Sequence, residues 1–211
     1  MSCPRMCAVA AVLVVLTACD TGDGRTLRPP PPGVTAPTSS TLLADASSST
    51  FEAGLGTTPI PSNMSLYSPE FVDGGPLPAQ YAACGGENVS PPLQWSGVPA
   101  GTVELALVVN DADAPNGGFL HWTVAGLSPA LAGLGPGAVP EGAIEARNDT
   151  SEFGWFGPCP PDGETHRYVF TLYALSSPSG VEQGAGGPEA VQAITSRPGA
   201  AATLSATYGL P

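Results

Sequence analysis

The sequence contains no lysine and only two histidines, and its formal net charge is −12 at pH 7. From Met64 onward the only cationic side chains are Arg147, Arg167 and Arg197. Affinity for nucleic acid comes mainly from many Lys and Arg side chains that neutralise phosphates and release counterions. The composition therefore argues against a nucleic-acid partner. It also requires any anion site to be local, built against the sign of the protein's overall charge.

The amino terminus lacks a hydrophobic run long enough to span a bilayer. Residues 8–16, AVAAVLVVL, form an apolar core that is too short for a transmembrane helix but typical of a signal peptide. The residues LTAC, which end at Cys19, resemble the lipobox of bacterial lipoproteins. This resemblance implies that residues 1–19 are a lipoprotein signal peptide, that Cys19 is lipidated, and that the chain is anchored to the cell membrane on its extracytoplasmic side. An ordinary secretory signal is the alternative.

Aromatic residues are absent between Asp20 and Thr50, where Pro, Ser and Thr dominate. Such a segment has too little apolar surface to offset the entropy of ordering its backbone. We therefore expect residues 20–63 to be a flexible tether and residues 64–211 to form one folded domain.

Cysteine is scarce in the predicted domain. Cys3 and Cys7 belong to the expected signal peptide and Cys19 to the lipidation site, so only Cys84 and Cys159 are left. Two cysteines in an exported domain most often form a disulfide. We therefore predict a bond between Cys84 and Cys159.

The predicted domain has more strand signals than helix signals. Residues 103–111, 120–127 and 166–175 are runs of β-branched, aromatic and aliphatic residues bounded by Gly and Pro. Both sides of the third run are largely apolar, which suits a central strand. One helix is expected at residues 187–197, where Pro188 takes the first position. The pattern predicts a mostly β domain with one or two short helices.

Each histidine begins a predicted strand directly after a loop rich in Gly and Pro. His121 follows DADAPNGGFL, and His166 follows GPCPPDGET. Strand ends reached from such loops can form a pocket, because the sheet fixes side chains that still face solvent. Two imidazoles, Asp111, Tyr168 and the backbone donors of FGPCPP would bind an oxyanion, and the carboxylates would attract an ammonium group. We therefore expect a pocket for a zwitterionic phosphorylated group.

Five motifs occur in the order and spacing of the phosphatidylethanolamine-binding protein family. They are SPPLQW (90–95), DADAP (111–115), HW (121–122), GPCPP (157–161) and HRYVFTLYAL (166–175). The chain resembles the bacterial branch that is similar to Raf kinase inhibitor protein. This resemblance implies a large antiparallel sheet, a second smaller sheet and an anion pocket at one edge. Carried over residue by residue, the pocket consists of Asp111, Asp113, Pro115, His121, Gly157, Pro158, His166 and Tyr168.

The sequence departs from the family pattern in two ways. Ala112 stands where the family usually has proline, and the loss of a fixed φ there would loosen the loop that presents Asp111. The chain also ends soon after Tyr208, without the carboxy-terminal helix that covers the pocket in animal members, so we expect a more open site. Bacterial relatives are often dimers, which makes a homodimer an expectation of the same resemblance.

Other readings of these residues stay open at this point. Two histidines and a carboxylate could bind zinc, although no pair has the spacing of a typical zinc motif. Cys159 and His166 could form a cysteine hydrolase, although a disulfide accounts for Cys159 more simply. The same pocket could also serve a protein-binding regulator, such as a kinase or protease inhibitor. The favoured prediction is a non-catalytic binding domain with no metal and no cofactor.

Overall fold

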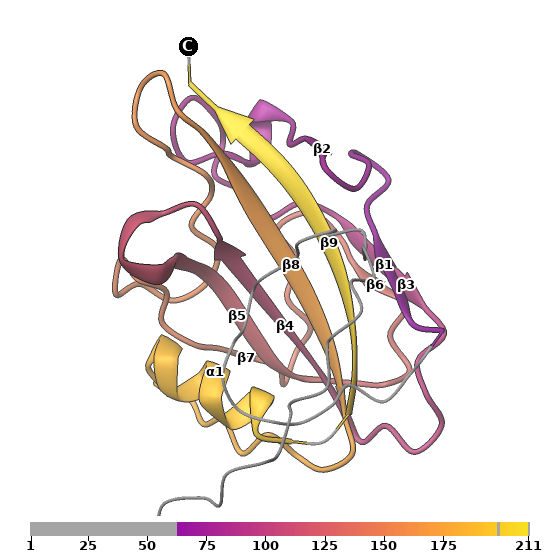
Figure 1. Ribbon diagram of the computed structural model, residues 1–211. Coiled ribbons are helices and arrows are strands. Elements are labelled where there is room, and N and C mark those ends of the chain that lie inside the picture. The colour runs from indigo at the N-terminus through magenta and orange to yellow at the C-terminus, as the bar shows by residue number, and fades with distance from the viewer. Residues whose placement is uncertain (1–62, 198, 211) are drawn as a thin grey trace, which may run out of the picture. The chain divides into compact units, whose positions relative to one another are not determined.

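The computed structural model describes residues 63–197 and 199–210. In this part of the chain, β-strands form two sheets, accompanied by the helix α1 (Gly187–Thr195) (Figure 1). The expected signal peptide, Cys19 and the tether up to residue 62 lie outside the described residues. No helix within the described part is long and apolar enough to cross a membrane.

The larger sheet has six strands in the order β2-β9-β8-β4-β5-β7. The strands are β2 (Gly75–Pro76), β4 (Glu104–Asp111), β5 (Phe119–Leu127), β7 (Ile144–Glu145), β8 (Thr165–Leu175) and β9 (Gly199–Gly209). Neighbours pair in antiparallel fashion, except that β2 runs parallel to β9. Because β8 lies between β9 and β4, the prediction of a central strand there is confirmed.

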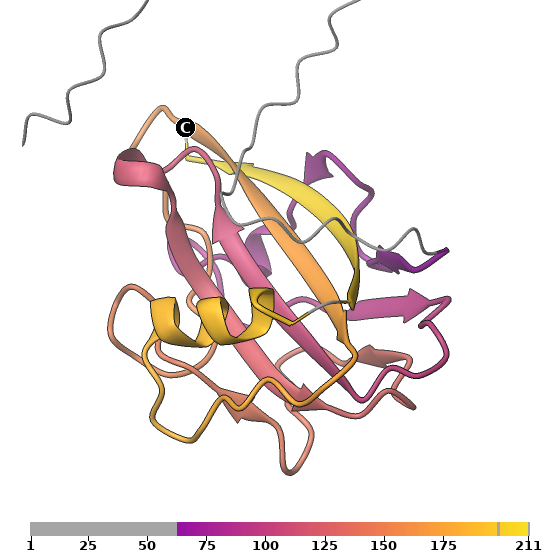
Figure 2. The same ribbon diagram turned by 60° about the horizontal axis from the view of Figure 1, so that its bottom comes forward.

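The smaller sheet has the order β1-β3-β6, with β1 (Ser65–Tyr67), β3 (Leu93–Ser96) and β6 (Gly133–Leu134). It packs on one face of the large sheet and α1 packs on the other, as alternation along β4 shows. Leu107 lies in one core cluster with Trp95 of β3, whereas Val108 lies in a second cluster with Ile194 of α1. The views in Figures 1 and 2 show the helix lying across the sheet. The predicted mostly β fold with two sheets is confirmed.

The strand β9 was not predicted from the sequence. Its residues GAAATLSATYG are mostly small, and Ala and Gly are depleted in strands. The strand nevertheless pairs with β8 along its whole length. Ala200, Ala202, Leu204 and Ala206 are buried in alternation with more exposed residues, so β9 contributes a shallow apolar face to the core.

Four strand ends meet at one end of the large sheet. β4 and β9 finish there and β5 and β8 begin there, because Asp111 pairs with both Phe119 and Tyr168, and His166 pairs with Tyr208. The short 3-10 helix η2 (Pro115–Gly117) lies in the loop between β4 and β5, and η1 (Ala79–Tyr81) lies in the segment between β2 and β3. This end of the sheet carries the candidate site.

Candidate functional site

Asp111 and Glu164 hold the His166 ring from its two nitrogens. The Nδ1 atom of His166 is 2.7 Å from Oδ2 of Asp111, and its Nε2 atom is 3.0 Å from Oε2 of Glu164. Two carboxylate acceptors favour the doubly protonated imidazolium, in which both nitrogens donate. The hydrogen bond to Asp111, assisted by the one to Glu164, raises the pKa of His166 above its ordinary value against the opposing effect of burial. The two carboxylates therefore favour the cationic form of His166.

The other oxygen of Asp111 fixes the loop that follows β4. Oδ1 accepts hydrogen bonds from the backbone N–H groups of Asp113 and Ala114 at 2.9 and 3.1 Å. The carboxylate of Asp113 accepts a hydrogen bond from the N–H of Arg167 on β8. The N–H of Ala112 donates a hydrogen bond to the carbonyl oxygen of Arg167. Proline has no N–H and could not make this last bond. Ala112 therefore ties the loop to β8 by a hydrogen bond that the proline usual in the family could not make.

His121 lies at a β-bulge in β5. Val109 pairs with Trp122 and Asn110 pairs with Leu120, so His121 is the extra residue on the β5 side. A bulge changes the direction in which side chains point and is common beside functional sites. Here Leu120 belongs to the core on the helix side and Trp122 to the core on the side of the smaller sheet.

The His121 ring is held in an aromatic environment. Its Nδ1 donates to the carbonyl oxygen of Phe156, which in the neutral ring leaves Nε2 as an acceptor. The ring stacks with that of Phe156 and meets the edge of Tyr168, with centroids 5.9 and 5.1 Å apart. Phe119 packs against it at 4.8 Å. Burial lowers the pKa of His121 below its ordinary value, and the bond to Phe156 and the Asp111 charge only partly oppose this effect.

Tyr168 connects the two histidines. It stands two residues after His166 on β8, so the two side chains share a face, and its ring contacts His121. Its hydroxyl is buried and makes no hydrogen bond of good geometry within the described part of the chain, although it interacts with the carboxylate of Asp111. Burial and the nearby Asp111 charge raise the pKa of Tyr168. A buried hydroxyl without a partner costs about 1–3 kcal/mol, so an acceptor that reached it would be favoured.

Gly157 and Pro158 form the wall beside His121. The N–H of Gly157 donates to Oδ1 of Asn88 at 2.7 Å, and the carbonyl of Pro158 accepts the N–H of Ala83 at 3.0 Å. The N–H of Phe156 donates to the carbonyl of His121. The expectation that the backbone of FGPCPP donates to a ligand is therefore wrong for Phe156 and Gly157, whose N–H groups are already used within the protein.

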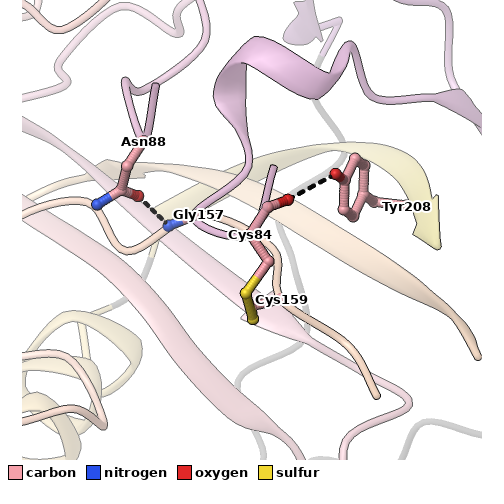
Figure 3. Close-up of a disulfide and its surroundings, with 5 residues drawn as sticks. All are labelled: Cys84, Asn88, Gly157, Cys159 and Tyr208. Atoms are coloured by element: carbon pink, nitrogen blue, oxygen red, sulfur yellow. Dashed lines mark hydrogen bonds between the residues drawn. A yellow bond between two sulfur atoms is a disulfide. The ribbon is translucent and has the colours of Figure 1, made fainter. Parts of the chain in front are cut away.

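A disulfide between Cys84 and Cys159 joins the same two segments (Figure 3). The carbonyl oxygen of Cys84 also accepts a hydrogen bond from the Tyr208 hydroxyl at 2.8 Å, which connects the pair to the end of β9. Gly157 has no room for a side chain, since an added Cβ would lie 2.3 Å from the carbonyl oxygen of Tyr81. Because Cys159 is bonded to Cys84, it has no thiol with which to act as a hydrolase nucleophile.

The polar groups of the site are buried. The exposed fractions are 4% for Asp111, 3% for His121, 6% for His166 and 0% for Tyr168. Aromatic rings pack over His121, and Glu164 covers one side of His166. Asp113 and Pro115 are exposed and belong to the loop around the site. Within the described residues, no group of three or more His, Cys, Asp or Glu side chains is placed to hold a metal ion.

Three residues that shape the site were not predicted from the sequence: Glu164, Asn88 and Tyr208. Glu164 stands two residues before His166, so strand alternation could have placed both on one face. The roles of Asn88 and Tyr208 depend on contacts over 69 and 124 residues of chain, which no local pattern reveals.

The comparisons with known proteins agree with this fold. A family model described as phosphatidylethanolamine-binding protein matches residues 67–209. LppC of Mycobacterium tuberculosis, whose name classes it as a lipoprotein, is 39% identical over 208 residues, which cover 97% of this chain and 95% of LppC. YbhB of Escherichia coli is 40% identical over 136 residues, 59% of this chain and 86% of YbhB. The chain belongs to the phosphatidylethanolamine-binding protein family.

Two crystal structures show the same architecture. A phosphatidylethanolamine-binding protein homologue from Chlamydia trachomatis has a TM-score of 0.66 and 36% identity, over 72% of this chain and all of that chain. YbcL of Escherichia coli, described as a member of the mammalian family, has a TM-score of 0.67 and 32% identity, over 71% of this chain and all of YbcL. Both structures support the fold class predicted from the sequence.

Proposed function

We propose that this protein is a non-catalytic binding domain that accepts a small phosphorylated or similar anionic group between His121 and His166. The observation that carries the proposal is the gathering of His121, His166, Asp111 and Tyr168 at one buried sheet end. Three strands supply these side chains, so the group is rigid without a ligand.

Different side chains of the site would contact different groups of such a ligand. His166 supplies positive charge, and the buried hydroxyl of Tyr168 supplies a donor for an anionic oxygen. The carboxylates of Asp111, Asp113 and Glu164 would attract an ammonium group on the same ligand. Phosphorylethanolamine, which carries a phosphate and an ammonium group, is therefore a suitable probe.

Tyr168→Phe tests this proposal without disturbing the fold. Phenylalanine keeps the ring that packs on His121 and removes a hydroxyl that makes no hydrogen bond of good geometry within the described residues. A hydrogen bond to a charged group contributes about 1.5–3 kcal/mol, so we expect at least a tenfold loss of affinity for phosphorylethanolamine in calorimetric titration of the full chain. Tyr173→Phe, on the opposite side of β8, is the matched control. If Tyr168→Phe binds as the unchanged protein does, the pocket is not at this site.

We also propose that lipidation of Cys19 anchors the domain outside the cytoplasmic membrane. The LTAC motif and the lipoprotein name of LppC support this localisation. An acyl anchor holds a protein to the membrane through its chains, so the folded domain itself need not touch lipid. We expect Cys19→Ala to move the protein from the membrane fraction to the soluble fraction. An unchanged distribution would contradict the anchor.

A further inference from the structure

Glu164 differs from the other groups that contact the histidines because it is exposed. Its side chain is 59% exposed, whereas His166 and Asp111 are almost completely buried. Its carboxylate nevertheless bonds to His166 at Nε2, at 3.0 Å. The Glu164 carboxylate thus faces solvent and is already paired with the imidazole of His166.

The two hydrogen bonds of His166 are not equally easy to exchange. The bond from Nδ1 goes to Asp111, which is buried and also holds two backbone N–H groups of the following loop. Breaking it would disturb that loop. The bond from Nε2 goes to a side chain at the surface, and exposed ion pairs contribute only about 0–1 kcal/mol. Only the hydrogen bond from Nε2 can therefore be transferred to a ligand at a small cost in free energy.

From this geometry we infer that the Glu164 carboxylate occupies the position that the anionic group of the ligand takes. The ligand binds by displacing this carboxylate from Nε2 of His166. The inference rests on the proposed function, because it uses the same pocket. Displacement also opens the site from the side of solvent, toward groups that are buried in the present arrangement.

The displaced carboxylate gives the site a preference among phosphorylated ligands. Glu164 stays within reach of the pocket on its side chain and repels a ligand that carries negative charge alone. A ligand with an ammonium group next to its phosphate offers the displaced carboxylate a new partner. Glu164 therefore selects a zwitterionic phosphate ester over inorganic phosphate.

Removal of the Glu164 charge tests the inference. We expect the full chain with Glu164→Gln or Glu164→Ala to bind inorganic phosphate about three- to tenfold more tightly than the unchanged chain, since a weak exposed pair and a nearby repulsion are both lost. Phosphorylethanolamine should gain less. Asp162→Asn is the matched control, because it removes the same charge from an exposed residue two positions away and should change phosphate affinity less than about twofold.

The outcomes separate this inference from the proposed function. If the unchanged chain binds phosphate and both Glu164 variants bind it no more tightly than Asp162→Asn does, displacement is wrong while the pocket stands. If both ligands gain equally, the preference for an ammonium group is wrong. If no variant binds either ligand, the pocket and the displacement both fail.

Discussion

At the scale of single residues, the two histidines have opposite tendencies toward protonation. Carboxylates raise the pKa of His166, and burial lowers that of His121, from a common ordinary value of 6.5. Near pH 6.5 the site should therefore hold one cationic and one neutral imidazole. An anion then meets a fixed positive charge on one side and an aromatic surface on the other.

Proton titration by NMR checks this difference, because the chain has only two histidines. We expect one C2–H signal to titrate above pH 6.5 and the other below it. Asp111→Asn should strongly lower only the higher of the two histidine pKa values, because it removes the carboxylate that accepts the main hydrogen bond of His166. Two coincident titrations near pH 6.5 would contradict the assignment, and Asp162→Asn should leave both values in place.

The same shifts determine how stability depends on pH. A raised pKa means that the folded state binds the His166 proton more tightly, so this stabilisation is complete below pH 6.5 and is lost as pH rises through the folded value. The lowered pKa of His121 has the opposite effect on the free energy of unfolding. The stability that depends on its neutral ring is lost as pH falls from 6.5 toward the lowered pKa of the folded state. Urea unfolding of Asp111→Asn should accordingly show less loss of stability above pH 6.5 than the unchanged protein.

The sequence predicted the central residues of the site because each has a local signal. Asp111, His121, His166 and Tyr168 stand at strand ends next to loops rich in Gly and Pro, and the structure brings them together. Which groups are already bonded to one another could not be predicted. The acceptor of the Gly157 N–H and the second hydrogen-bond partner of His166 come from loops, whose conformations no periodic pattern describes.

At the scale of elements, the bulge in β5 orients His121, and the disulfide joins the segment with Gly157 and Pro158, which lies beside it, to the segment around Cys84. The bulge was not predictable, because the sequence FLHWTV shows no Gly or Pro that would mark an interrupted ladder. The disulfide was predictable from composition alone. Its position beside Gly157 and Pro158 follows from the packing of the segment at 81–88 on that loop.

Loss of the disulfide should reduce the stability of the domain. The bond closes a separation of 75 residues. On the chain-entropy estimate such a loop contributes about 3–5 kcal/mol to the free energy of unfolding. Cys84→Ala with Cys159→Ala should show this loss in urea unfolding, and a reducing agent should lower the unfolding midpoint of the unchanged protein but not that of the double variant. Equal midpoints for all samples would show that the bond contributes nothing.

At the scale of the whole molecule, strand identity and the mostly β class followed from runs of β-branched and aromatic residues. The strand β9 did not, because its buried positions are largely alanine and give little apolar contrast. Only its pairing with β8 across the complete strand shows its importance. Long-range pairing of this kind depends on the rest of the sheet, so a window of sequence cannot reveal it.

The net charge of −12 should slow the approach of anions to the pocket. Repulsion by exposed charges is screened as the Debye length falls from about 30 Å at 0.01 M salt to about 8 Å at 0.15 M. We therefore expect the association rate constant of a phosphorylated anion to rise over this range of sodium chloride, measured by stopped-flow. A rate that falls would indicate local steering by a positive surface instead.

The hydrogen bonds at both nitrogens of His166 also limit the chemistry that this side chain can perform. An imidazole whose two nitrogens both donate to carboxylates has no lone pair with which to take a proton from water or a hydroxyl. Activation of a nucleophile by His166 would first require the ring to lose a proton that two anions hold in place. Such a ring is suited to attracting and orienting charge, and unsuited to general-base catalysis.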